Sequence, residues 1–280
     1  PDDFPMISTR GHFDADGNLQ SGTEPTAYRT TGDWERHRSE DDEELIVFVH
    51  GWIHDEARAR NATYTCDLSL EHNQYDEQVV GFSWDSDYGD NPFEWLEKVQ
   101  IAIAEDEYAR ARELFANLEL AWDVSVEIAK QNGQKLAAWI ADHLDDDGRP
   151  VRLVAHSLGA QVTVSALATL HEWGRNDAVE SVTLLGGAIA EDVVELDEEY
   201  GADVEYATKQ FHNFHKWNDW MLGLGFQIQE LDDAIGEVGI DNPWDAPDNY
   251  TDVNVTLQVP DHESYFEPDD GCIPLVVKTF

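Results

Sequence analysis

The feature that most constrains the fold is a series of short apolar runs, each of a length typical of a buried strand. The runs are Leu45–Val49, Val79–Trp84, Val151–Ala155, Val182–Leu185, Phe211–Trp217 and Val253–Val259. Continuous β-branched and aromatic runs are typical of strands covered on both faces. Helical stretches at Asn132–Leu144 and Leu158–Trp173, and a long one from Pro92 to Lys130, lie between several of them. The alternation predicts an α/β fold with a mostly parallel central sheet and helices on both faces.

Residues 1–280 are expected to form a single domain. No linker rich in Gly, Ser or Pro separates the apolar runs, and the sequence has no internal repeat. Before Leu45 the chain is rich in turn residues and has two short strand-like runs, around Met6–Phe13 and Thr26–Thr31.

A serine lies at the junction between a predicted strand and a predicted helix. The motif AHSLG occupies residues 155–159, with Ser157 at its centre. A serine on a sharp strand-to-helix turn, with small residues two positions before and after it, forms a nucleophile elbow. Ala155 stands where glycine is usual, and a methyl group is small enough for that position. His156 lies on the opposite side of the turn and is not a candidate base.

A second motif, HGW at residues 50–52, follows the run Leu45–Val49. In a fold with a nucleophile elbow, the loop after this strand supplies one backbone N–H to the oxyanion, and the residue after the serine supplies the other. The expected donors are therefore the amide of Trp52 or Ile53 and the amide of Leu158.

An acid and a histidine must follow the serine in that order to complete a triad. His262 comes just after the last predicted strand, where such a histidine belongs, whereas the other histidines after Ser157 lie within a predicted helix or strand: His171, His212 and His215. Asp219 directly follows the run Phe211–Trp217 and is the favoured acid. Asp192, after the preceding strand, is the alternative.

With these motifs, the segment from about residue 45 to residue 266 resembles a serine esterase or lipase of the α/β-hydrolase fold. Within that fold it resembles the acidic hydrolases of haloarchaea. The resemblance implies a carboxylic ester hydrolase that uses Ser157, His262 and Asp219, forms an acyl-enzyme and requires no cofactor. Two alternatives remain open: an amidase, thioesterase or peptidase with the same triad, and a non-catalytic binding protein of the same fold.

Two further expectations concern the surroundings of this site. The residues expected to line the substrate pocket are His50, Ile53, Trp84, His156 and Trp220. Segment 87–119 exceeds what a minimal member of the fold needs, so we expect either a helical cap or lid over the site or a longer covering helix.

The net charge of the chain limits the classes of partner that it is expected to bind. Asp and Glu number 59 against 17 Lys and Arg, which gives a net charge of −42 at pH 7. An acidic surface repels phosphate backbones and anionic headgroups, so nucleic acid and membrane surfaces are not expected partners. No apolar run approaches the roughly 18–20 residues that span a bilayer, so no integral membrane segment is expected. The expected partner is a small-molecule or lipid ester.

Carboxylates distributed along the whole chain predict adaptation to high salt, because self-repulsion destabilises such a fold unless ions screen it. An acidic protein with a cationic partner is the alternative. The chain begins at Pro1 rather than Met, from which we expect that a leading segment was removed. Haloarchaeal hydrolases of this kind are commonly exported by the twin-arginine route, so the resemblance implies secretion, with a cytoplasmic location as the alternative.

Two other patterns bear on ligands and cross-links. Residues 85–90 are rich in Asp, but their spacing does not fit a calcium loop. His212 and His215 do not fit a metal site either, so no bound metal is expected. Cys66 and Cys272 are either two buried thiols or one disulfide. If the protein is exported, we expect the disulfide.

Overall fold

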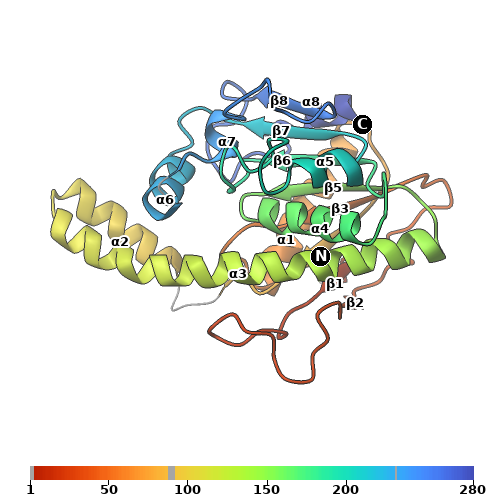
Figure 1. The fold of residues 1–280 in the computed structure, drawn as a ribbon, viewed down its shortest axis with the longest axis horizontal. Helices are drawn as coiled ribbons and strands as arrows, with labels where there is room; N and C mark the ends of the chain where they lie inside the picture. The colour runs from red at the N-terminus through yellow and green to blue at the C-terminus, as the bar shows by residue number, and fades with distance from the viewer. Residues whose placement is uncertain (1–2, 88–91, 231) are drawn as a thin grey trace.

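A computed structural model describes residues 3–87, 92–230 and 232–280. Its strands form one eight-stranded sheet in the order β2-β1-β4-β3-β5-β6-β7-β8 (Figure 1). Neighbouring strands are parallel except for β2, which pairs antiparallel with β1 at one edge. This mostly parallel sheet, with a serine elbow after the central β5, is an α/β-hydrolase fold. The predicted fold class is therefore confirmed.

The strands are β1 (Met6–Ser8), β2 (Arg29–Thr31), β3 (Leu45–Val49), β4 (Gln78–Ser83), β5 (Val151–His156), β6 (Ser181–Leu185), β7 (Phe211–His215) and β8 (Tyr250–Asn254). The helices are α1 (Glu56–His72), α2 (Pro92–Ala104), α3 (Tyr108–Asp146), α4 (Gly159–Glu172), α5 (Gly201–Ala207), α6 (Trp220–Glu230), α7 (Ile235–Val238) and α8 (Ile273–Val276). A 3-10 turn, η1 (Val277–Thr279), ends the chain.

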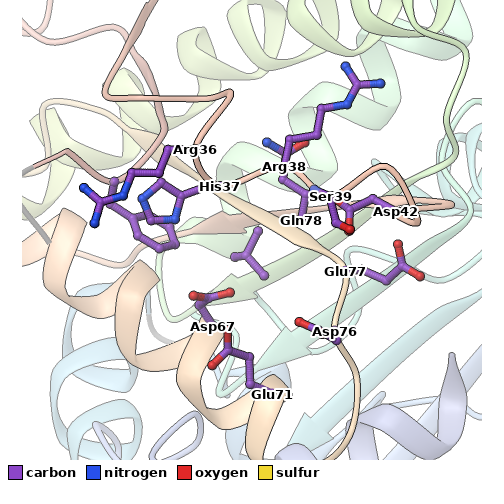
Figure 2. A pocket seen from close by; sticks show the side chains of 12 residues that line it. Arg36, His37, Arg38, Ser39, Asp42, Asp67, Glu71, Asp76, Glu77 and Gln78 are labelled. Atoms are coloured by element: carbon purple, nitrogen blue, oxygen red, sulfur yellow. The ribbon is translucent and has the colours of Figure 1, made fainter.

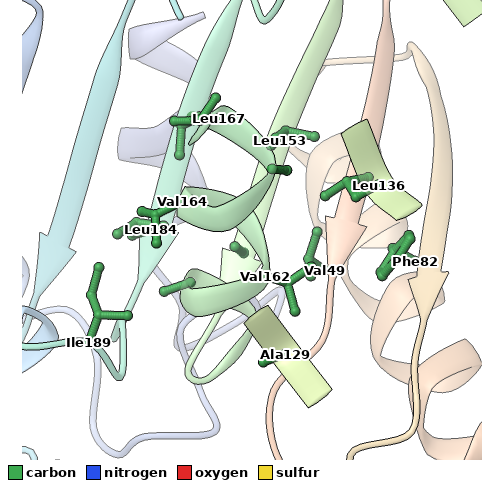
Figure 3. Close-up of a cluster of buried hydrophobic side chains, with 14 of the residues drawn as sticks. Val49, Phe82, Ala129, Leu136, Leu153, Val162, Val164, Leu167, Leu184 and Ile189 are labelled. Carbon is green, nitrogen blue, oxygen red and sulfur yellow. The ribbon is translucent and has the colours of Figure 1, made fainter. Parts of the chain in front are cut away.

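Two apolar clusters cover the two faces of the sheet. Along β3, Val47 and Val49 belong to one cluster, while Ile46 and Phe48 belong to the other. Successive side chains of a strand point to opposite faces, so an unbroken apolar run is what a doubly covered strand requires. Figure 3 shows the first cluster, in which strand side chains meet those of α4 and α3. The second cluster includes side chains from α1 and α8.

The long helical region differs from the prediction in where it breaks. We expected helices over Pro92–Lys130 and Asn132–Leu144; instead, α2 ends at Ala104 and α3 continues to Asp146. The chain turns at Asp106, whose φ is 59°. Gly133 does not interrupt α3: its backbone lies against α4, and a Cβ there would come within 2.4 Å of the Ser165 Cβ.

In Figure 1, α2 and the first part of α3 form a helical hairpin that extends beyond the sheet. This hairpin includes the described part of segment 87–119; residues 88–91 of that segment lie outside the described residues. Of the helices in the described part of the chain, none combines the length and apolarity needed to cross a membrane.

Two other expectations were wrong. The last strand is Tyr250–Asn254 rather than Val253–Val259. Val255 and Val259 are apolar because they pack, buried, in the second cluster after the strand has ended. The conditional disulfide is absent too: both cysteines are free and buried in that cluster. The thiol of Cys272 donates instead to the Tyr265 carbonyl, at 3.4 Å.

Candidate active site

The loops after β3, β5 and β7 meet at the carboxyl edge of the sheet, and each contains one strained residue. Ile53, Ser157 and Asn218 have φ of 62°, 53° and 60°, in the left-handed region that non-glycine residues avoid. Such strain persists only where the surroundings enforce it, and it concentrates at functional sites. The carboxyl edge of the sheet, to which the sequence motifs pointed, therefore also contains strained backbone.

Ser157 occupies the turn between β5 and α4. Close packing of that helix against β3 requires a residue without a side chain at position 159, because a Cβ on Gly159 would lie 2.4 Å from the Val49 carbonyl oxygen. The Ser157 amide donates to Leu185 O at 3.1 Å, which ties the turn to the neighbouring strand β6. Only 8% of Ser157 is exposed.

The structure brings Ser157, His262 and Asp219 together from three separate loops. His262 Nε2 lies 2.9 Å from Ser157 Oγ, and His262 Nδ1 lies 2.8 Å from Asp219 Oδ2. Because Nδ1–H donates a hydrogen bond to the carboxylate, Nε2 carries no proton and can accept a hydrogen bond from the Ser157 hydroxyl. Tyr265 also donates to Asp219 Oδ2, at 3.4 Å. All three residues are buried.

Burial and charge oppose each other at His262. Burial lowers the pKa of the imidazole, but the carboxylate of Asp219, with further help from Glu263 and Asp261, raises it above its ordinary value. Burial likewise raises the pKa of Asp219, and the charge of His262 and their hydrogen bond lower it below the ordinary value. The pair therefore favours an ionised Asp219 beside a histidine that binds a proton readily.

His156 lies beside this pair rather than within it. Because a carbonyl only accepts, His156 Nε2–H donates to the His262 carbonyl oxygen, at 2.7 Å. Burial lowers the pKa of His156 to about 4, so the ring is neutral near pH 7. His156 supports the backbone of His262 and shares no proton with Ser157 in any described hydrogen bond.

The amides that we expected to bind an oxyanion differ in whether a hydrogen bond already occupies them. The amide of Ile53 donates to Ser86 O at 2.8 Å and is therefore occupied. Within the described residues, no hydrogen bond occupies the amides of Trp52 and Leu158. The indole of Trp52 is itself anchored, because Nε1–H donates to Ser125 Oγ on α3 at 2.7 Å.

The expected pocket residues lie in different places. His50 and Trp84 are 1% and 0% exposed and stack with their ring centroids 5.5 Å apart, so neither offers an accessible face. The two rings pack against each other beside the loop after β3, and their place in a substrate pocket stays a prediction. Ile53 is also buried, whereas Trp220, at the start of α6, is 45% exposed.

Arg10, which the sequence analysis missed, supports the same loop. Its guanidinium donates to Ser83 Oγ at 2.7 Å, to Asp87 Oδ1 at 2.9 Å and to the His54 carbonyl at 2.6 Å. No local signal marks it, because it follows a short strand 40 residues before the nearest motif.

The alternative acid and the other histidines lie apart from Ser157. No described side-chain contact joins the Asp192 carboxylate to His262, although Asp192 follows β6 as expected. His171 contacts Asp203 at 2.7 Å on the far part of α4. His215 ends β7, and its Nδ1 lies 3.4 Å from Glu237 O.

Two cavities open on the described part of the surface. One, of about 270 Å³, lies next to the triad loops and is lined in part by His54, Arg58 and Glu263. The other, of about 240 Å³, reaches the start of β4 and therefore lies at the opposite edge of the sheet (Figure 2). Burial and the nearby Glu71 and Asp76 raise the pKa of Asp67 in that cavity to about 7.

Among the described residues, the group whose ligand atoms lie close enough together to hold a metal ion is His156, His262 and Glu263. Both ring nitrogens of His262 already have hydrogen-bond partners, Asp219 and Ser157. This group therefore overlaps the series Asp219–His262–Ser157 rather than forming a separate site. Of the acidic segment 85–90, residues 88–90 lie outside the described residues; Asp85 accepts from the Gly11 amide at 2.8 Å.

Comparison with known proteins gives partial relatives and a distant structural likeness. The chain is 30% identical over 146 residues to the "Transmembrane and coiled-coil domain-containing protein STS1" of Oryza sativa subsp. japonica, covering 51% of this chain and 21% of that protein. It is also 30% identical over 146 residues to the "Uncharacterized membrane protein C6F6.13c" of Schizosaccharomyces pombe, covering 52% and 18%. The chain thus spans about a fifth of the length of these relatives.

Among solved structures, the mature lipase BlEst2 of Bacillus licheniformis is 17% identical, with 88% of this chain and 95% of that chain covered and a TM-score of 0.46. A family model described as "Protein of unknown function (DUF726)" matches residues 112–269. The match includes Ser157, Asp219 and His262 and extends over more than half of the sequence. The chain therefore belongs to the DUF726 family.

Proposed function

We propose that this protein is a serine hydrolase that cleaves carboxylic esters, with Ser157 as the nucleophile. The observation that carries the proposal is the hydrogen-bonded series Asp219–His262–Ser157, with contacts of 2.8 and 2.9 Å. A nucleophile bonded to a base, which is in turn oriented by a carboxylate, is the arrangement that activates a serine. The two unoccupied amides of Trp52 and Leu158 support the same reading.

In this proposal, His262 accepts the Ser157 proton as Oγ bonds to the ester carbonyl carbon. The carbonyl oxygen gains the electron pair, and the Trp52 and Leu158 amides stabilise it. The intermediate collapses by breaking the bond to the alcohol, which leaves with the proton from His262. Water then attacks the acyl-serine, with His262 again as base, and the carboxylic acid departs.

We also propose that the α2–α3 hairpin caps this site. Trp52 donates to Ser125 of α3, and Trp122 of α3 donates to Glu230 of α6 at 2.8 Å, so α3 contacts two of the loops or helices beside the triad. Ile101 on α2 and Leu120 on α3 are 48% and 69% exposed and would give a cap apolar surface for an acyl chain.

The test of the proposal is labelling with a fluorophosphonate in high salt, followed by peptide mapping. The label is expected on Ser157 in the wild type and absent from the folded Ser157→Ala variant. Turnover of p-nitrophenyl esters of graded chain length then defines the acyl preference. An unlabelled but correctly folded wild type would favour a binding protein, and label without ester turnover would favour an amidase or peptidase.

The acid is tested by a matched pair of variants. Asp219→Asn is expected to lower kcat by about 10⁴, because the carboxylate holds the imidazole tautomer. Asp192→Asn, which removes an equal charge, is expected to leave kcat unchanged. The reverse outcome would reassign the acid and keep the reaction class.

A further inference from the structure

We infer that His50 is a positioning residue that aims the Trp52 amide at the oxyanion; the inference rests on the proposed ester hydrolysis. His50 directly follows β3, at the start of the loop, and is 1% exposed. It makes no contact with Ser157 in any described hydrogen bond, so its effect must pass through the loop backbone.

The partners of the two ring nitrogens of His50 determine its tautomer. The Trp84 amide lies 3.1 Å from Nε2, and Nη2 of Arg10 lies 3.4 Å from the same nitrogen. Both groups only donate, so Nε2 is the acceptor and the ring proton is on Nδ1. Nδ1–H then donates to the Gly51 carbonyl oxygen at 2.8 Å.

That carbonyl belongs to the same planar unit as the Trp52 amide. In a trans peptide the C=O and the following N–H point in opposite directions, so a carbonyl held on the side of His50 directs the Trp52 N–H to the other side. The unit borders the nucleophile, because a Cβ on Gly51 would lie 2.8 Å from the Ser157 Cβ. A rotation of this peptide would therefore remove the amide from the developing oxyanion.

The loop needs this support because its own conformation is strained at Ile53, two residues past the carbonyl that His50 holds. Arg10 fixes the far side of the loop through the His54 carbonyl and at the same time borders His50 Nε2. His50 is itself immobilised: its ring stacks on Trp84 at an interplanar angle of 9°, and the Trp84 indole donates to the His50 carbonyl at 3.0 Å. Burial lowers the pKa of His50 well below its ordinary value, in keeping with a neutral ring.

Two amide variants separate the positioning role from simple packing. Glutamine in His50→Gln places its polar atoms near the position of Nε2 and leaves the Gly51 carbonyl without a donor. Asparagine in His50→Asn places an amide N–H near the position of Nδ1 and restores that donor. Because loss of one oxyanion donor costs about 10²–10³ in kcat, we expect a fall of that order for His50→Gln with little change in KM. His50→Asn should recover at least about tenfold of that loss.

Affinity for a trifluoromethyl ketone, which forms an oxyanion on Ser157, gives a readout that packing alone would not move. Across the variants it should fall in proportion to kcat/KM. The matched control is His143→Gln. His143 is largely covered, with 8% of its side chain exposed, stacks on Trp139 with centroids 5.1 Å apart, and has its Nε2 3.2 Å from a backbone carbonyl. This control should leave kcat, KM and inhibitor affinity unchanged.

Wild-type kcat in a folded His50→Gln variant, or a loss of kcat without loss of inhibitor affinity, would overturn the inference while leaving the proposed function intact. An unlabelled wild type would overturn both. The ¹⁵N spectrum of histidine-labelled wild-type protein tests the inference without relying on the folding of a variant. It should contain a buried ring protonated at Nδ1 and assigned to His50, and protonation at Nε2 instead would refute the positioning role.

Discussion

The side chain of His156 donates to the backbone carbonyl of His262 at 2.7 Å, across 106 residues of sequence. The residue just before the proposed nucleophile thus supports the backbone of the proposed base. The ring centroids of the two histidines lie 4.9 Å apart, and Phe266 contacts His156 edge-on, so the donor is held in place by packing. A change at His156 should therefore affect the base without touching the substrate.

We predict that His156→Phe lowers kcat by about 5- to 10-fold, because one net hydrogen bond contributes about 1 kcal/mol. The same loss should lower Tm by about 2–4 °C. His156→Gln retains a donor near the position of Nε2 and should keep most of the wild-type rate. Ester kinetics and thermal melts of both variants test this prediction, which is wrong if the two variants lose kcat equally.

The rate should fall on the acid side at a pH above about 6.5, the ordinary pKa of histidine. His262 must be neutral to accept the serine proton, and its pKa is raised by Asp219, Glu263 and Asp261 despite burial. Acidification through that raised pKa protonates the base and abolishes turnover. The profile of kcat/KM against pH reports this value for the free enzyme.

Glu263→Gln should shift this acid limb toward lower pH, because it removes one of the negative charges that favour the protonated His262. Glu267→Gln is the control, since Glu267 lines the same cavity but is absent from the main causes of the His262 shift. An acid limb that stays in place in Glu263→Gln, or moves equally in both variants, would contradict the assignment.

The hydrogen-bonded series Asp219–His262–Ser157 was predictable in part, because parallel strands bring their carboxyl ends to one edge of the sheet. Ser157 and Asp219 follow runs that are strands in the structure, whereas His262 was placed from a run, Val253–Val259, most of which lies after β8 has ended. Sequence patterns could not have placed Arg10 or Ser125, because their contacts with the loop after β3 join side chains that lie 40 and 73 residues from their partners.

The predicted ends of one helix and one strand were wrong because tertiary packing is not visible in the sequence. One helix was expected to end at Lys130 and the next to begin at Asn132, yet α3 continues through both positions and α4 packs against it at Gly133. Val255 and Val259 resemble strand residues, yet they are apolar because they are buried beneath a turn. Local periodicity reports that a residue is buried, and only tertiary packing decides which element buries it.

The close approach at Gly133 leads to a stability prediction. A methyl group there would lie 2.4 Å from the Ser165 Cβ and 2.6 Å from the Ser165 carbonyl carbon. Gly133→Ala should therefore destabilise the fold by about 1–3 kcal/mol through overpacking, although alanine alone favours a helix by up to about 1 kcal/mol. Urea melts should show this loss, and the exposed neighbour Gln134, as Gln134→Ala, should change the free energy of unfolding by less than about 0.5 kcal/mol. A more stable Gly133→Ala variant would contradict the packing.

Salt should stabilise the fold strongly. At a net charge of −42, carboxylates repel one another across the surface, and at molar salt the Debye length falls to about 3 Å. We predict that Tm rises steadily between dilute buffer and molar KCl. A Tm that is independent of KCl would reject adaptation to salt.

Asp67 allows a local test of the same repulsion. Its folded-state pKa of about 7 exceeds its ordinary 3.8 because of burial, Glu71 and Asp76. For a group with a raised folded pKa, the folded state loses stability as pH rises from the unfolded value through the folded one. Asp67→Asn, which mimics the protonated acid, should therefore raise Tm in dilute buffer, and more at pH 8 than at pH 5. The gain should shrink in molar KCl, since salt screens Glu71 and Asp76 but leaves burial unchanged. The control Asp197→Asn removes an equal charge from an exposed position, and equal gains in both variants would show that total charge, rather than this half-buried carboxylate, sets the effect.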